Sequence, residues 1–225
     1  NDGTDLETPD DEIYDPATDS FSVIPDSPRS ASTALRAVLL SDGRVLVAGN
    51  ESCFNYPGIG EVCSGWPQLF DPASGAWAEV ASFPPTQDYG RTRGLTMLPN
   101  GRVLVVKYDN PGWPYPSTSS AFLFDPGAGD TWRRAGGPSV PGLVSGGTLL
   151  PGGDVLFVTD AMELVLYEAD TDRFRQPFPP VGIPGWGGGV STATLTDGRV
   201  LLVGGANEEE TAAVPFAAVF DPATG

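Results

Sequence analysis

Short apolar segments alternate with polar turns along this sequence, and one such unit recurs in a fixed order. At four places a glycine-containing turn leads directly into an apolar run. These turns are Asp42-Gly43-Arg44, Asn100-Gly101-Arg102, Gly152-Gly153-Asp154 and Asp197-Gly198-Arg199. Asp-Gly and related pairs favour hairpin turns, because glycine tolerates positive φ. Each place therefore predicts two antiparallel strands joined by a two-residue type of turn.

A second phrase joins an aromatic residue, an acid and, in most copies, a proline. Phe70-Asp71-Pro72-Ala73-Ser74 is a complete example. Proline presets φ at the second turn position, and aspartate can accept a hydrogen bond from the backbone two residues later. A repeat of roughly 50 residues made of short strands is typical of propeller blades. The acidic residues of this phrase recur at such spacings: Asp15, Asp71, Asp125, Glu168 and Asp221.

Residues 33–80 illustrate one complete unit. Strands are predicted at 33–40, 44–48, 67–70 and 76–80, with a long loop before the third. Together they form a four-stranded antiparallel blade. Further whole blades are predicted at 93–134 and 143–176, and partial ones lie at the two ends of the chain. We therefore predict an all-β fold, an incomplete β-propeller of three whole and two partial blades over residues 13–225, with 1–12 as an acidic tail or linker.

Taken together, these phrases resemble the kelch repeat. The resemblance rests on the Asp-Gly-Arg turn before Val-Leu-Val, the Gly204-Gly205 pair, the Phe-Asp-Pro-Ala-Thr-Gly turn, and Trp77 or Trp132 in the last strand. The chain is similar to the propeller domain of galactose-oxidase-like secreted bacterial proteins. The resemblance implies a ring with more blades than this chain supplies. An open end would expose sheet faces and strand edges, so we expect a second chain or a further segment to complete the ring.

The formal net charge of −17 argues against nucleic acid and anionic membrane surfaces as partners. No apolar stretch is long enough for a membrane helix. The acidity is consistent with simple solubility or with a cation-binding surface. Asp170, Asp172 and the acidic N-terminus offer oxygen ligands, but none has the spacing of an EF-hand loop. We predict no cofactor, with calcium as the alternative.

The chain has two cysteines, Cys53 and Cys63, and no histidine. Two cysteines alone do not make a zinc site, so we predict a disulfide that closes the loop between them. A disulfide indicates an oxidising compartment. The predicted location is therefore secreted or extracellular, with the periplasm as the alternative.

Loop length divides the predicted propeller into two faces. Short turns lie at one end of each blade, whereas long connections lie at the other, and binding residues concentrate on long loops of a rigid scaffold. Aromatic rings stack on ligands and arginine clamps carboxylates, although such rings also pack loops against themselves. The candidate ligand-binding residues on the long-loop face are Tyr89, Arg91, Arg93, Tyr108, Trp113, Tyr115 and Trp186.

The absence of histidine removes the copper site of the oxidases that the resemblance brings to mind, and any Ser-His-Asp triad. No catalytic residue is predicted. The main prediction is a non-catalytic extracellular module that binds a protein or a glycan through the long-loop face. One alternative is a half-propeller assembly unit completed by another chain. The other is a divergent carbohydrate-active enzyme, a hydrolase or a lyase.

Overall fold

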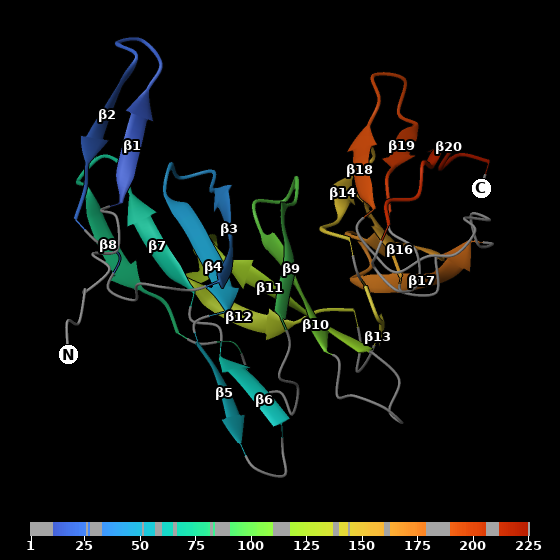
Figure 1. Ribbon diagram of the computed structural model, residues 1–225, viewed down its shortest axis with the longest axis horizontal. Coiled ribbons are helices and arrows are strands. Elements are labelled where there is room, and N and C mark those ends of the chain that lie inside the picture. The colour runs from blue at the N-terminus through green and yellow to red at the C-terminus, as the bar shows by residue number, and fades with distance from the viewer. Residues whose placement is uncertain are drawn as a thin grey trace.

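The computed structural model consists of small antiparallel sheets that stand in a row in chain order (Figure 1). The structure describes residues 11–25, 27, 33–50, 52–56, 60–64, 67–81, 83, 91–109, 118–136, 140–143, 145–159, 163–178, 190–205 and 212–224. Within these ranges, only the backbone is described for residues 33–35, 50, 52–56, 60–64, 91, 109, 140–141 and 176–178.

Three of the sheets are whole blades, in each of which four strands are hydrogen-bonded side by side. Blade A contains β3 (Thr33–Leu39), β4 (Val45–Asn50), β7 (Gln68–Asp71) and β8 (Ala76–Glu79). Blade B contains β9 (Arg91–Met97), β10 (Val103–Asp109), β11 (Thr118–Asp125) and β12 (Thr131–Arg134). Blade C contains β14 (Thr148–Leu149), β15 (Val155–Val158), β16 (Leu164–Glu168) and β17 (Arg173–Phe178).

The two ends of the row are partial blades. The N-terminal pair is β1 (Glu12–Asp15) with β2 (Ser20–Val23), and the C-terminal sheet is β18 (Ser191–Thr194), β19 (Val200–Val203) and β20 (Ala217–Phe220). The prediction of an incomplete propeller with three whole and two partial blades is therefore confirmed. The first strands of successive blades are neighbours, since β9 contacts both β3 and β14, and β14 contacts β18. First strands are thus innermost and fourth strands outermost.

Two elements were not predicted. The connection between β4 and β7 was expected to be a loop, but it contains the hairpin β5 (Ser52–Tyr56) and β6 (Gly60–Ser64), which forms a sheet of its own. Between blades B and C, β13 (Val140–Pro141) pairs with β11 as an extra strand of blade B. These segments lack the repeated phrases, so periodicity gave no signal for them.

The turns between first and second strands are longer than the two-residue type that we predicted. In blade A the Gly43 amide donates to the Leu40 carbonyl at 3.1 Å, and the Leu40 amide donates to the Arg44 carbonyl at 2.8 Å. Gly43 itself is left-handed, with φ of 90°, which is the three-residue hairpin with a glycine bulge. The other three turns repeat this left-handed glycine at Gly101, Gly153 and Gly198.

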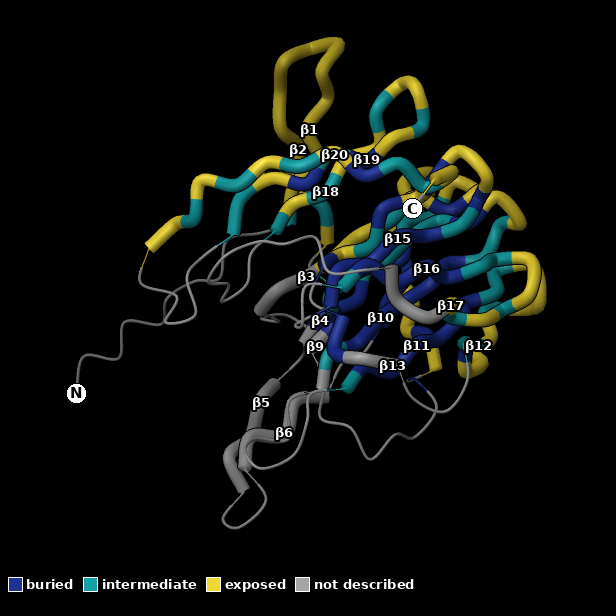
Figure 2. The backbone as a smooth tube through the Cα atoms, turned by 90° about the vertical axis from the view of Figure 1, so that its right-hand side faces the viewer, coloured by how far each residue is buried: buried dark blue, intermediate teal, exposed yellow. Residues whose placement is uncertain are grey.

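The acid of the second phrase caps its own turn, as predicted. Asp71 accepts the Ala73 amide at 2.9 Å and the Ser74 hydroxyl at 2.7 Å. Asp15 and Asp221 accept the equivalent amides of Ala17 and Ala223. Hydrogen bonds from the Ser74 hydroxyl and the Ala73 amide hold the pKa of Asp71 below its usual value. In Figure 2 these turns are among the exposed parts of the fold, which is consistent with a scaffolding role.

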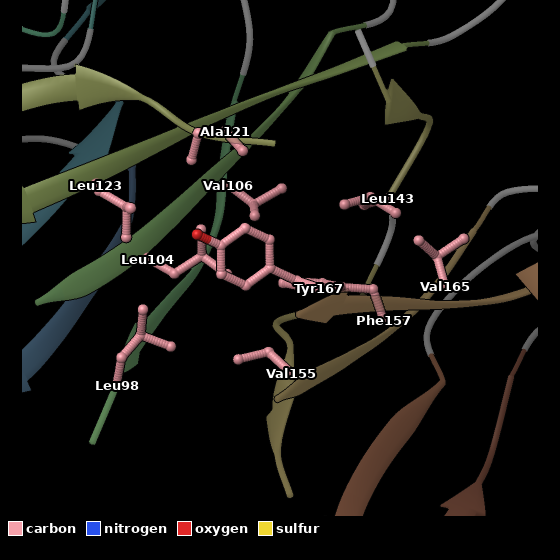
Figure 3. Close-up of a cluster of buried hydrophobic side chains, with 11 residues drawn as sticks. Leu98, Leu104, Val106, Ala121, Leu123, Leu143, Val155, Phe157, Val165 and Tyr167 are labelled. Atoms are coloured by element: carbon pink, nitrogen blue, oxygen red, sulfur yellow. The ribbon is translucent and has the colours of Figure 1, made fainter. Parts of the chain in front are cut away.

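The hydrophobic core lies between blades. Strands β10 and β11 are buried on both faces, because one face packs on blade A and the other on blade C. Figure 3 shows the joint between blades B and C, where the Tyr167 ring lies close to Leu104, with Val155 and Phe157 beside it. A third cluster joins blade C to the C-terminal sheet through Leu156, Leu202 and Phe220.

Ion pairs reinforce two of these joints at the short-turn end. Arg44 of blade A binds Asp130 of blade B through two hydrogen bonds of 2.8 Å each. Arg133 of blade B donates to Asp172 of blade C, which also accepts the Gly136 amide at 3.1 Å. Each pair runs from an arginine of one blade to an aspartate of the following blade. Among the described residues, no helix is long and apolar enough to span a membrane.

Candidate functional site

The candidate site lies at the long-loop end of blade B, where β9 begins and β10 ends. The pairing between β9 and β10 is irregular in this region. Gly94 pairs with Val106 and Thr92 pairs with Lys107, so Arg93 is an extra residue in β9. Such a bulge interrupts the side-chain alternation of a strand and re-aims the bulged residue. The backbone therefore gives Arg93 an orientation that a regular inner strand would not.

Arg93 packs on the aromatic ring of Tyr108. Its guanidinium carbon lies 5.0 Å from the ring centroid, within the range of a cation–π interaction. Both side chains are partly exposed. The contact with the ring limits the rotamers of the side chain, and a guanidinium presents its N–H donors in its own plane. This arrangement suits the binding of an anionic group.

A close backbone contact between blades lies beside this pair. A Cβ atom added to Gly94 would lie 1.9 Å from the carbonyl oxygen of Gly146. A Cβ added to Gly146 would lie 3.5 Å from the carbonyl oxygen of Arg93. The bulge of blade B therefore packs directly on the segment that leads into β14, and any side chain larger than hydrogen at Gly94 would force the two blades apart.

Buried hydroxyl groups surround this joint, and two of them bind the backbone. Ser119 Oγ accepts the Leu143 amide at 2.8 Å, and Ser145 Oγ accepts the Val158 amide at 2.8 Å. Because their oxygens already satisfy amides of the scaffold, we assign Ser119 and Ser145 to structural support of the site.

Lys107 is a residue that the sequence reasoning missed. It is only 6% exposed in β10, and its ammonium nitrogen lies 5.4 Å from the ring centroid of Phe83. Buried lysines are rare in proteins. The available signal was its position, since this lysine directly follows the four apolar residues that begin β10. It faces blade A, whereas Tyr108, the next residue, contacts Arg93.

Several acidic side chains lie at the opposite, short-turn end. Asp42 binds Arg44, Asp125 binds Arg102 at 2.7 Å, and Asp197 binds Arg199 at 2.7 Å. The Arg102 hydrogen bond holds the pKa of Asp125 below its usual value despite partial burial. Within the described ranges, no group of three or more His, Cys, Asp or Glu could hold a metal ion.

The structure brings together two of the seven predicted ligand-binding residues, Arg93 and Tyr108. Arg91 is the first residue of β9 and pairs with Tyr108, but only its backbone is described. Cys53 and Cys63 are directly opposite each other in the β5–β6 hairpin, and their side chains lie outside the description. The remaining predicted site residues also lie outside the described residues: Tyr89, Trp113, Tyr115 and Trp186.

Solved structures with similar folds are β-propeller-type proteins. The chain is similar to the protein YjhT, with 15% identity and a TM-score of 0.59 over 84% of this chain and 63% of that one. It is similar to a catalytically inactive virginiamycin B lyase from Staphylococcus aureus crystallised with quinupristin, with 15% identity and a TM-score of 0.56 over 90% and 60% of the two chains. A luciferin-regenerating enzyme matches with 11% identity and a TM-score of 0.57 over 91% and 68%.

These likenesses show the propeller-type fold, and the chain spans only 60% to 68% of the three structures. No protein-family model matches the sequence, and no curated protein matches it. The comparisons therefore do not confirm the kelch subtype or the likeness to galactose oxidase.

The prediction of a non-catalytic binding module is wrong. Two of these three similar structures are enzymes, and none is a binding module by its description. The error lay in the argument from histidine, since the lack of histidine excludes only mechanisms that require it. Arginine, tyrosine, lysine and carboxylates also supply acid–base and electrostatic catalysis.

Proposed function

We propose that this chain forms part of a carbohydrate-active enzyme of the lyase class, with its substrate bound at the long-loop end of blade B beside blade C. The observation that carries the proposal is Arg93, placed on a bulge of the innermost strand with its guanidinium carbon 5.0 Å from the Tyr108 ring centroid. A guanidinium binds a carboxylate through two parallel hydrogen bonds. The phenol beside it is a group that can transfer a proton.

The substrate class that fits this pair is a polysaccharide containing uronic acid. In a β-elimination, a base removes the proton from the carbon next to the carboxylate. The released electrons form a carbon–carbon double bond, and the bond from the following carbon to the glycosidic oxygen breaks. That oxygen leaves with a proton, so no water is consumed. Arg93 would stabilise the negative charge that develops on the carboxylate. Tyr108, as a phenolate, would take the proton from the carbon and would then give it, as a phenol, to the departing glycosidic oxygen.

Hydrolysis is less well supported by the described residues. Glycoside hydrolases mostly use two carboxyl groups that flank the scissile bond. The carboxylates with described ion pairs, such as Asp42, Asp125 and Asp172, bind arginines at the other end of the blades. The similar structure of a lyase adds an analogy at the level of the fold only.

Three further features belong to the proposal. The repeated turn phrases favour the kelch subtype of propeller and its galactose-oxidase-like secreted branch. The register of Cys53 opposite Cys63 favours a disulfide, because paired positions of antiparallel strands have Cα separations within the disulfide range. A disulfide in turn favours secretion. No cofactor is part of the proposed reaction.

The test compares polygalacturonate and alginate with neutral polysaccharides. Elimination is followed by the ultraviolet absorbance of the new conjugated double bond. We expect turnover of a polyuronate, a loss of about 100-fold in kcat/KM for Arg93→Ala, and a similar loss for Tyr108→Phe. Arg134→Ala is the matched control, because Arg134 also lies over an aromatic ring, that of Phe122, but on the outermost strand of the same blade.

Two results would contradict the proposal. Saturated reducing ends released without the double bond would indicate a hydrolase. Equal activity of Arg93→Ala and Arg134→Ala would remove Arg93 from the site.

A further inference from the structure

The two ends of the row carry faces that resemble the sides of an internal joint. At the N-terminal pair, Tyr14, Phe21 and Val23 are 46%, 66% and 62% exposed. At the C-terminal sheet, Val203 and Val219 are 36% and 49% exposed. We call these the N-terminal face and the C-terminal face. In Figure 1 they stand at opposite ends of the molecule.

A left-handed aspartate marks the receiving side of each ion-paired joint. Three non-glycine residues among those described have positive φ: Asp19 at 52°, Asp130 at 58° and Asp172 at 54°. All three end the turn between the third and fourth strands of their units. Asp130 and Asp172 each bind an arginine of the preceding blade. Asp19 occupies the same position on the N-terminal face, where the described residues include no preceding blade.

The surroundings of Asp19 repeat those of Asp172. Tyr14 donates to Asp19 at 2.8 Å, and Tyr167 donates to Asp172 at 2.7 Å. Tyr14 packs on Phe21 at 5.0 Å between ring centroids, just as Tyr167 packs on Phe174 at 5.1 Å. The difference is burial: Tyr167 is fully buried by blade B, whereas Tyr14 is exposed. The N-terminal face therefore has the side chains of an inter-blade surface, and no blade covers it among the described residues.

The C-terminal face carries the matching arginine. Arg199 follows an Asp-Gly turn, and its Nε donates to Asp197 at 2.8 Å, as the Nε of Arg44 donates to Asp42 at 2.9 Å. Arg44 also binds Asp130 of the next blade and is 28% exposed. Arg199 is 50% exposed. Arg199 is thus positioned, like Arg44, to bind a left-handed aspartate of a following unit.

We propose that the C-terminal face of one copy of this chain docks on the N-terminal face of a second copy, with Arg199 binding Asp19 and with Val219 packing against Tyr14 and Phe21. Charge complementarity and continuity with the internal joints identify the occupant. The two faces lie at opposite ends of the molecule in Figure 1, so they do not meet within one copy, and a second copy offers the matching face. The interface is heterologous, and copies therefore associate head to tail, closing a ring or extending as a string.

The test measures mass by light scattering over a range of concentrations of the chain. We expect association above the monomer mass of 23.5 kDa. Arg199→Asp or Asp19→Arg alone places like charges together and should weaken association about tenfold or more. The double variant restores opposite charges and should recover it. Arg173→Asp is the control, since it makes the same charge change on an exposed residue of blade C.

Phe21→Glu provides a second test through the apolar part of the interface, and its ring is exposed in the single chain, so folding should be unaffected. Circular dichroism checks that each variant is folded. A monomer at every concentration would overturn the proposal. So would an oligomer that neither single charge reversal weakens, because another surface would then hold the copies together. Neither result bears on the proposed lyase site, which is tested by turnover.

Discussion

The phenol of Tyr167 donates a 2.7 Å hydrogen bond to Asp172, five residues later in the same blade. Tyr167 is fully buried at the joint with blade B, and burial, together with this bond, raises the pKa of its phenol above the usual value. Asp172 in turn accepts Arg133 and the Gly136 amide from blade B. This one carboxylate therefore joins two blades.

Removing the Tyr167 hydroxyl should measure how much the hydrogen bond to Asp172 contributes to stability. We expect Tyr167→Phe to lower the free energy of unfolding by about 1 to 3 kcal/mol, since it leaves an oxygen of the partly buried Asp172 carboxylate with one donor fewer. Tyr14→Phe is the matched control, because Tyr14 makes the same bond to Asp19 on an exposed face. Urea unfolding at low protein concentration would measure the free energy of unfolding of both variants. Equal losses for the two variants would contradict the role of burial.

Acid should weaken the joint between blades B and C. Burial acts to raise the pKa of Asp172, but the hydrogen bonds from Arg133, Tyr167 and Gly136 outweigh it, and the pKa is lowered. A lowered pKa stabilises the fold above the unfolded value of about 4, and this stability is lost as the pH falls through the folded value. Urea unfolding from neutral to acidic pH should show a steep loss below about pH 4. Asp172→Asn should be less stable at neutral pH and should show a shallower loss in acid.

Gly94 should tolerate no side chain. Because an added Cβ would lie 1.9 Å from the Gly146 carbonyl oxygen, Gly94→Ala should destabilise the fold by about 3 kcal/mol, the upper end of ordinary overpacking. A Cβ added at Gly152 would meet nothing within 4 Å, so Gly152→Ala serves as the control. Chemical denaturation of the two variants provides the comparison. A Gly94→Ala protein as stable as the control would show that the blades can separate at little cost.

The two cysteines should form a disulfide in the purified protein. Mass spectrometry after alkylation without reduction should find neither thiol labelled. Replacement of both by serine should lower the free energy of unfolding by up to ~3 kcal/mol in the chain-entropy model. Cys53 and Cys63 stand opposite each other in the hairpin. Full labelling of both thiols before reduction would rule the disulfide out.

The repeated phrases predicted the scaffold well for a physical reason. Left-handed glycines such as Gly43 and capping acids such as Asp71 are demanded by backbone geometry, so the same residues recur wherever the same turn recurs. The hairpin formed by β5 and β6 escaped prediction because it occurs once and repeats nothing. Repetition in this sequence therefore reflects the constraints that each turn places on the local backbone.

The candidate site was only partly predictable. Loop length pointed to the end of blade B where Arg93 and Tyr108 lie in contact, but the bulge that orients Arg93 is a matter of register between two strands. Register depends on packing across the whole sheet, and it cannot be predicted from any single residue type. The burial of Lys107 was hidden for a similar reason, because strand alternation does not say which blade a side chain faces.

The burial of both faces of β10 and β11 has a consequence for how the molecule opens. Blade B packs on blade A through one face and on blade C through the other, whereas each partial blade has a neighbouring blade on one side only within the part of the chain that the structure describes. In such a row of units, each stabilises only those next to it, and loss of structure starts most easily at the ends. Backbone amides of Val105 and Leu123 should therefore exchange with solvent deuterium most slowly, and those of the outermost units should exchange first.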